Sequence, residues 1–558
     1  MRKLVVPILV GLLLLTTGCT GGVADSAEPR AESVTSAPDS ALTLVADADP
    51  VASAVSTSRA LFDRSTVAVV ARDGDDAAAL LGSAAAVGLG VPLLVQPAGG
   101  GAGEVVGAEL DRLGATAVLV VGETGAAATS SSEGGREVVA VAADSAAVEA
   151  ATGLDLADAD PVPADGAAAA VAALDPQHPA ALRPVDVGGP GSSSTAGNGS
   201  ADADATVPQV DRGDPLTGTM VLASGSPESL AGIATARAAG ADVRLTGGQT
   251  DPRGSADVVT ALSQDRPDTV VALGADFAGV QGLDWKLRTA VEGAQLPGGG
   301  QLLFPQHMMV ALYGTPGTGA LGVLGEQGLP ESIQRARDTA APYQELVDAT
   351  VVPAFEIIAT VASSAAGSDG DYSAESDVET LRPWVEAAGE AGVYVVLDLQ
   401  PGRTDFLTQA RLYQPLLELP HVGLALDPEW RLRPDQVHLT QIGQVGIEEV
   451  NQVVTWLADL TRDRALPQKL LVLHQFQVRM IVDRERLDTS REELAIMVHA
   501  DGQGTQPMKQ DTWQVLHQDA PAPLSWGWKN FYDEDSPTLT PEQTIAGVQP
   551  NPQLVTYQ

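Results

Sequence analysis

Polar side chains follow several apolar segments in the C-terminal half of the chain, at the point where each segment ends. Residues 393–399 contain Asp398 near their end, and residues 422–426 are followed directly by Asp427 and Glu429. The other ionisable or aromatic side chains near such ends are Trp430, His474, His499, Asp501, Trp526, Trp528 and Lys529. Carboxylates, imidazoles and amines transfer protons and bind polar substrates. Their recurrence at segment ends therefore predicts a catalytic or ligand-binding site.

Asp427 and Glu429 are two carboxylates separated by a single residue. Paired carboxylates hydrolyse a glycosidic bond when one protonates the leaving oxygen and the other activates water. We predict that Glu429 is the general acid, with Asp427 or Asp398 as the base or an electrostatic partner. The indole rings of Trp430, Trp526 and Trp528 would stack on sugar faces. The remaining polar groups would bind substrate, and they are His474, His499, Asp501 and Lys529.

The tripeptide Asp427-Pro428-Glu429 resembles the Asp-x-Glu motif of barrel glycosidases, including muramidase-type lysozymes and chitinase-like enzymes. The resemblance implies carbohydrate hydrolysis at the rim of a barrel. The sequence departs from the commonest retaining arrangement at Lys529, where a nucleophilic carboxylate would be expected. Three acids follow that lysine in a short segment and are the candidates to replace such a nucleophile: Asp533, Glu534 and Asp535.

Two other functions fit the same residues. Histidine and carboxylate side chains could bind Zn²⁺ or Mn²⁺ in a metal-dependent hydrolase; the candidate ligands are Asp398, Glu429, His474, His499 and Asp501. No His-x-His or His-Glu-x-x-His spacing supports that reading, and we expect no metal and no cofactor. The third possibility is a non-catalytic glycan-binding domain.

An alternation of apolar strands and helices predicts the architecture of the C-terminal half. The expected strands are 309–313, 355–361, 393–399, 422–426, 470–476, 494–499, 524–528 and 554–557. The expected helices are 331–346, 377–391, 405–417, 439–461, 478–487, 508–516 and 541–546. Eight strands alternating with helices predict a (β/α)₈ barrel over residues 299–558, whose active site would lie at the carboxyl ends of the strands. Because no helix follows the last strand, we expect the helix 281–292 to cover it.

The N-terminal half contains almost no aromatic residues and repeats one pattern of strands and helices, over residues 57–185 and 215–298. Continuous apolar strands between helices predict parallel sheets, here as tandem Rossmann-like units. The blocks DAAALLGSAAAVGLGVPLLV and ELDRLGATAVLVVGETG resemble the cell-wall-binding repeat type 2 family. Known members bind anionic wall polymers through basic grooves, whereas this pair is acidic, so a spacer without ligand is the alternative. Residues 186–214 are rich in Gly, Ser and Asp and predict a disordered linker.

The first 19 residues have the order of a bacterial lipoprotein signal: a basic start, a short apolar core and small residues before Cys19. Cys19 is the only cysteine of the 558 residues, and lipidation would explain it. We expect a flexible tether over residues 20–56 and a lipid-anchored, extracytoplasmic location at the cell membrane. The net charge of −40 argues against nucleic acid as a partner. The resemblances to barrel glycosidases and to cell-wall-binding repeats imply cell-wall polysaccharide or peptidoglycan as the partner. The abundance of Ala, Asp and Arg is typical of high-GC actinobacteria.

Overall fold

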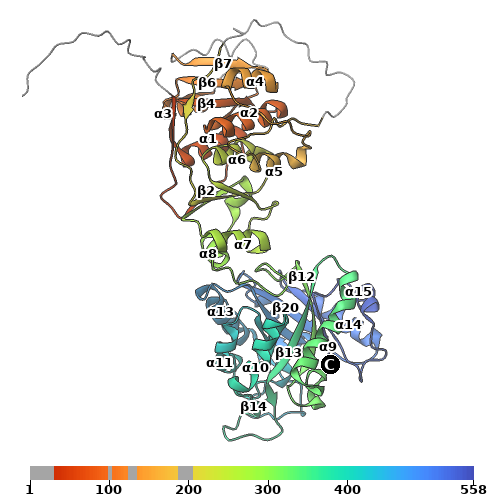
Figure 1. Ribbon diagram of the computed structural model, residues 1–558. Coiled ribbons are helices and arrows are strands. Elements are labelled where there is room, and N and C mark those ends of the chain that lie inside the picture. Colours follow the sequence, from red (N-terminus) through yellow and green to blue (C-terminus); the bar gives the residue numbers. More distant parts are fainter. Residues whose placement is uncertain (1–30, 99–102, 123–134, 186–204) are drawn as a thin grey trace, which may run out of the picture.

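The C-terminal half of the chain forms a closed barrel, as the sequence predicts. The computed structural model describes residues 31–98, 103–122, 135–185 and 205–558 (Figure 1). The barrel consists of eight parallel strands: β12 (His307–Gly314), β13 (Thr350–Ala362), β15 (Tyr394–Leu399), β16 (Val422–Leu426), β18 (Lys469–Gln475), β20 (Leu494–Ala500), β21 (Ser525–Asn530) and β22 (Leu554–Tyr557). Strand β12 pairs with both β22 and β13, which closes the barrel. The short strand β14 (Ser373–Glu375) pairs antiparallel with the end of β13.

Side chains alternate between the barrel interior and the surrounding helices, because successive residues of a strand point to opposite faces. Apolar residues such as Met309, Val352 and Val472 fill the barrel interior toward the amino ends of the strands. The outward residues share a large core with the helices: α9 (Leu329–Ala340), α10 (Val378–Glu390), α11 (Phe406–Leu412), α12 (Gln414–Leu417), α13 (Ile447–Asp463), α14 (Gln506–His517) and α15 (Pro541–Gly547). The apolar half of each strand thus holds the barrel together and leaves its carboxyl end for polar groups.

Two of the predicted helices differ in the structure. Residues 478–487 form two 3₁₀ turns around the short strand β19 (Ile481–Val482), which pairs with β17 (Val445–Gly446). A φ of 60° at Asp483 prevents a continuous helix there. The helix expected over 439–461 begins only at Ile447, and Leu439 also has a positive φ, of 62°. Residues 431–446 instead form a long loop above the barrel.

The helix α8 (Leu283–Glu292) does not cover the last strand, so that prediction is wrong. Its buried residues Leu283, Leu287 and Ala290 pack in a cluster with Met220 and Val258 of the N-terminal half. An apolar stripe shows that a helix has a buried face, but it does not show which surface that face meets. The outer face of β22 is covered instead by a segment of the C-terminal half itself. Tyr343, which follows α9, lies against Tyr557 of β22, with the two hydroxyls 2.6 Å apart.

The N-terminal half contains two four-stranded parallel sheets. Their orders are β5-β4-β6-β7 and β10-β9-β11-β2. The strands are β4 (Val67–Arg72), β5 (Leu93–Gln96), β6 (Ala117–Val121), β7 (Glu137–Val141), β9 (Thr219–Ala223), β10 (Asp242–Leu245), β11 (Thr269–Leu273) and β2 (Leu42–Val45). The helices are α1 (Pro50–Leu61), α2 (Asp76–Leu89), α3 (Glu104–Leu113), α4 (Ser145–Thr152), α5 (Ala167–Ala172), α6 (Leu230–Ala238) and α7 (Ala256–Asp265). Helices α2 and α6 are rich in Ala and Gly and pack closely in one core that both sheets share.

Residues 31–56 were expected to belong to a tether, and here the structure differs. They contain β1 (Ala31–Thr35), β2 and the first part of α1. Strand β1 pairs with β3 (Phe62–Ser65) and with β8 (Val210–Asp211), which lies in the predicted linker. Strand β2 joins the edge of the second sheet beside β11. These short strands are only partly buried, so their composition stays polar and resembles that of a loop.

The lipoprotein signal, Cys19 and residues 186–204 of the predicted linker lie outside the described residues. None of the helices in the described ranges is long and apolar enough to cross a membrane.

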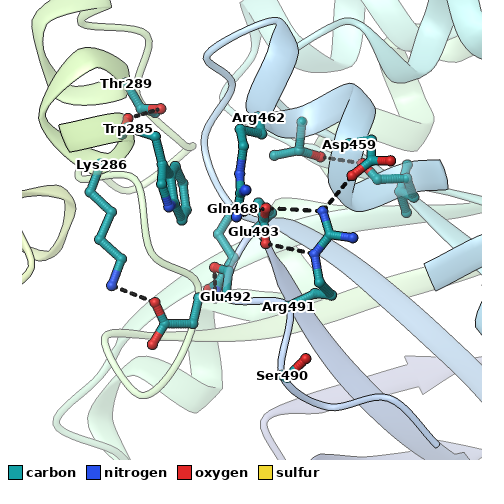
Figure 2. Close-up of polar contacts among 12 residues, drawn as sticks. Trp285, Lys286, Thr289, Asp459, Arg462, Gln468, Ser490, Arg491, Glu492 and Glu493 are labelled. Atoms are coloured by element: carbon teal, nitrogen blue, oxygen red, sulfur yellow. Dashed lines mark hydrogen bonds and ion pairs between the residues drawn. The ribbon is translucent and has the colours of Figure 1, made fainter. Parts of the chain in front are cut away.

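The two halves meet at the amino ends of the barrel strands. Figure 2 shows Trp285 of α8 beside Arg462 of α13, and Lys286 paired with Glu492 just before β20. Arg253 and Arg462 lie over the Trp285 ring, with their guanidinium carbons 4.4 and 4.9 Å from its centroid. The carboxyl ends of the strands point away from this joint.

Candidate functional site at the carboxyl end of the barrel

Toward the carboxyl end of the barrel, each strand or the residue directly after it places a polar side chain inward. This polar layer consists of Tyr313, Glu356, Asp398, Asp427, His474, His499, Lys529 and Thr556, none more than 4% exposed. Strand register places Tyr313 beside Glu356, His474 beside His499, and Lys529 beside Thr556. Because neighbouring parallel strands end at the same level, residues as far apart in the sequence as Tyr313 and Thr556 come together in one ring.

His474 is surrounded by carboxylates. Its Nε2 lies 2.7 Å from Glu356 Oε1 and 3.9 Å from Asp398 Oδ1. Its Nδ1 lies 3.1 Å from Asp501 Oδ2, an ion-pair contact without the alignment of a hydrogen bond. Burial alone would lower the pKa of His474, but the charges of Glu356, Asp501 and Asp398 hold it well above its ordinary value. The ring is therefore an imidazolium at neutral pH.

Asp398 lies on β15, the strand next to the one that carries Glu356. Tyr313 donates a hydrogen bond from its hydroxyl to Asp398 Oδ2 at 2.9 Å, and Gln400 Nε2 donates to the Tyr313 hydroxyl at 3.3 Å. Burial raises the pKa of Asp398 to about 6, even though the nearby positive charge of His474 lowers it.

Glu429 and Asp501 differ in the direction of their pKa shifts. Burial, followed by the negative charge of Asp501, raises the pKa of Glu429 to about 7. Burial would also raise the pKa of Asp501, but its contacts with His474 hold the value below the ordinary one. A pKa of about 7 lets Glu429 hold a proton at a pH where Asp501 is ionised. Two carboxyl groups separated in this way can serve as an acid and a base.

Asp427 has a more structural position than its neighbour Glu429. Its carboxylate accepts a hydrogen bond from the Glu429 backbone N–H at 3.2 Å and caps the turn Pro428–Trp430. Burial and the charge of Asp398 raise the pKa of Asp427 well above its ordinary value. Asp427 thus orients the turn that carries Glu429.

Lys529 places its ammonium over the Tyr313 ring, with Nζ 3.5 Å from the ring centroid. In the described part of the chain, no carboxylate or other acceptor lies within ion-pair or hydrogen-bond distance of this ammonium. Its charge nevertheless lowers the pKa of Glu429, Asp398 and Asp501, although other influences outweigh it at the first two.

A cavity of about 290 Å³ opens beside Glu429, at the loop 431–446. Its lining consists of Glu429, Trp430, His438, Leu439, Thr440, Gln441 and Ile442. The Trp430 and His438 rings meet edge to face at 5.4 Å, and His438 Nε2 lies 2.9 Å from the Tyr372 carbonyl oxygen. Leu439 is 87% exposed at the lip. The cavity therefore offers an aromatic wall, uncharged polar side chains and one carboxyl group.

The structure brings most of the predicted site residues together. Trp430 lines the cavity. Seven others lie in or directly above the polar layer: Asp398, Asp427, Glu429, His474, His499, Asp501 and Lys529. His499 Nε2 lies 3.0 Å from the Thr556 hydroxyl, and burial lowers its pKa well below the ordinary value.

The predicted sugar platform of Trp526 and Trp528 is not at the site. Both rings face the helix layer, where each lies within 6 Å of Trp513, and Trp526 stacks on His517 at 3.5 Å. The reason is strand parity, since Lys529 and Gly527 occupy the inward positions of β21. Of the three acids after Lys529, Asp533 and Glu534 are exposed, and Asp535 forms a buried ion pair with Lys509 at 2.8 Å.

Sequence reasoning missed Glu356, Tyr313 and Thr556. Glu356 could have been found, because it is the one charged residue inside the apolar run 351–362 and shares its face with Val352 and Ala354. A carboxylate in such a position is unfavourable without a partner. Tyr313 and Thr556 are common strand residues and gave no comparable signal.

The polar layer suits an imidazolium better than a metal ligand at His474, because both of its nitrogens face carboxylate oxygens. In the described residues, the acidic groups close enough to one another to share a cation lie elsewhere, in the loop beside β14: Asp369, Asp371 and Glu375.

No family model and no curated protein matches the chain. Among solved structures, Cwp6 from Clostridium difficile is 14% identical with a TM-score of 0.32, over 65% of this chain and 63% of its own. Cwp8 from Clostridium difficile is 13% identical with a TM-score of 0.30, over 46% of this chain and 53% of its own. The chain thus spans less than two thirds of either protein. Similarity this distant assigns no function, so the function has to be argued from the site.

Proposed function

We propose that the chain hydrolyses a carbohydrate of the cell envelope at the carboxyl end of its barrel. The observation that supports this most directly is the position of Glu429. It joins the buried polar layer to an open cavity that has an aromatic wall and room for a sugar ring. An acid with a raised pKa in a partly apolar site is suited to protonate a leaving group.

In the proposed reaction, Glu429 donates its proton to the glycosidic oxygen while the bond from that oxygen to the anomeric carbon breaks. Water adds to the anomeric carbon, and Asp501 accepts the proton that the water loses. Asp501 is a better base than Asp427 or Asp398, because it stays ionised while their pKa values are raised. His474 keeps Asp501 ionised by ion pairing, and Trp430 supplies the surface on which the sugar packs.

Replacing Glu429 by Gln tests this proposal. Glu429→Gln should lower the release of reducing ends from cell-wall glycan by about 10²-fold or more, because the proton donor is lost. The free energy of unfolding should change by less than about 1 kcal/mol, since the residue lies at a rim and not in a core.

Glu534→Gln is the matched control, because Glu534 is an exposed acid at the same end of the barrel. It should leave hydrolysis unchanged. Full activity of Glu429→Gln would contradict the proposed role. Inhibition by EDTA that added Zn²⁺ or Mn²⁺ reverses would instead favour the metal-dependent mechanism.

We further propose that the chain is held at the outer face of the cell membrane by a lipid on Cys19, with the N-terminal half as a repeat-like spacer. The support is the order of residues 1–19 and the single cysteine of the chain. Cys19→Ala should move the exported protein from the detergent phase to the aqueous phase in a partitioning assay. Retention of the variant in the membrane fraction would place the anchor elsewhere.

A further inference from the structure

The polar layer contains both donors and acceptors that have no partner. The Lys529 ammonium, on a side chain 3% exposed, lies over the faces of Tyr313 and Phe531 and has no hydrogen-bond or ion-pair acceptor in the described part of the chain. Three buried carboxylate oxygens also accept no hydrogen bond from described residues: Glu356 Oε2, Asp398 Oδ1 and Asp501 Oδ1. Unpaired buried polar groups are costly and rare in native proteins, so a set of them in one layer needs an explanation.

The chemistry of these groups restricts what could satisfy them. An anionic ligand could accept from Lys529 but could not donate to the carboxylate oxygens. An ammonium ligand could donate to the carboxylates but could not accept from Lys529. A hydroxyl group does both, because it carries one donor and two acceptor lone pairs. A polyhydroxylated, uncharged molecule therefore matches the layer better than either kind of ion.

Charge leads to the same conclusion. The layer and its immediate neighbours hold five carboxyl groups, on Glu356, Asp398, Asp427, Glu429 and Asp501, against the positive charges of His474 and Lys529. Because the pKa values of Asp427, Asp398 and Glu429 are raised, part of the negative charge is neutralised by protons. A positively charged ligand would meet the Lys529 ammonium, and a negatively charged ligand would meet the carboxylates. Both encounters take place in a buried environment, where repulsion is poorly screened.

We infer that the site binds a neutral saccharide, and that Lys529 fixes it by donating hydrogen bonds to sugar oxygens. This inference deepens the proposed function by naming the substrate class. Lys529 selects between substrates and does not transfer the proton. Beyond Glu429, the cavity is lined by Trp430 and by polar side chains such as Thr440 and Gln441, which extend the same preference outward from the layer.

The test measures binding without turnover, by calorimetric titration of the Glu429→Gln protein at pH 7. The probes are neutral tetrasaccharides (chitotetraose, mannotetraose and cellotetraose), the anionic tetramer of galacturonic acid, and the cationic tetramer of glucosamine. We expect at least one neutral probe to bind, and both charged probes to bind at least about tenfold more weakly than the best neutral one.

Adding Lys529→Met should weaken the best neutral probe by about tenfold or more, because a buried donor is lost. Lys529→Gln keeps an amide donor and should lose less than Lys529→Met. Lys469→Met is the matched control. Lys469 is equally buried, but it lies at the opposite end of the barrel, where its ammonium donates to the carbonyl oxygens of Leu419 and Val422 at 2.9 Å.

Three results would overturn the inference: no neutral probe binds, the galacturonate binds best, or Lys529→Met binds as tightly as its parent. Folding of each variant is checked by near-UV circular dichroism. The probe series alone still decides the question if Lys529→Met does not fold. Neutral probes that bind to a protein without hydrolytic activity would refute the proposed function and leave this inference standing. Hydrolysis of an acidic glycan would support the proposed function and refute this inference.

Discussion

At the scale of single residues, Glu429 and Asp501 carry opposite pKa shifts, which predict the pH dependence of hydrolysis. A general acid must be protonated, so the rate should fall as pH rises through about 7, the pKa of Glu429. A base must be ionised, and the pKa of Asp501 lies below its ordinary value of 3.8, so the acidic limb should appear only below that value. The profile of kcat/KM from pH 3 to 9 measures both limbs.

The outcome that would contradict this assignment is a rate that rises as pH increases through 7. In that case Glu429 would act in its ionised form, and the roles of the two carboxyl groups would be exchanged.

The sequence reveals site residues that stand at strand ends, but it does not reveal which of them face inward. Asp427 and His474 follow apolar runs, and their positions in the polar layer follow from that pattern. Trp526 and Trp528 end a strand in the same way, yet they face the helices because their parity is that of the outer face. A shift of one residue exchanges the two faces of a strand. The aromatic wall at the site comes instead from loop residues, whose position no periodicity encodes.

At the scale of elements, apolar runs were sufficient to find every strand of the barrel. Each such strand is buried on both faces, so its sequence is continuously apolar and hard to mistake. Strands β1, β2 and β8 were not found, because they are short, only partly buried and carry Ser, Thr and Asp. The same limit explains the segment 478–487, where Ile481 and Val482 pair in a two-stranded ribbon that no helical pattern could indicate.

At the scale of the whole molecule, the joint and the site lie at opposite ends of the barrel. The N-terminal half covers the amino ends of the strands, so the carboxyl ends stay open to a large substrate. The net charge of −40 would repel anionic polymers at long range. That repulsion agrees with a neutral glycan as the ligand and disfavours the binding of anionic wall polymers by the N-terminal half.

The joint itself is built around one side chain. Trp285 is 7% exposed and lies against guanidinium groups from both halves of the chain, Arg253 and Arg462. Lys286 pairs across the same boundary with Glu492, and buried Glu493 holds Arg462 in place (Figure 2). A tryptophan packed between charged groups contributes burial and cation–π attraction together. We therefore expect the two halves to unfold together in calorimetry, as one transition.

Trp285→Ala should uncouple the unfolding of the two halves. Removal of a buried tryptophan costs roughly 3–5 kcal/mol, and here most of that stabilisation acts between the halves, so two transitions should replace one. Trp384→Ala is the matched control, because Trp384 of α10 packs on Phe355 of β13, with ring centroids 6.2 Å apart, away from the joint. It should lower the temperature of the single transition without splitting it. Two transitions in the unmodified protein, or a single lowered one in Trp285→Ala, would show that the halves are coupled by some other contact or not coupled at all.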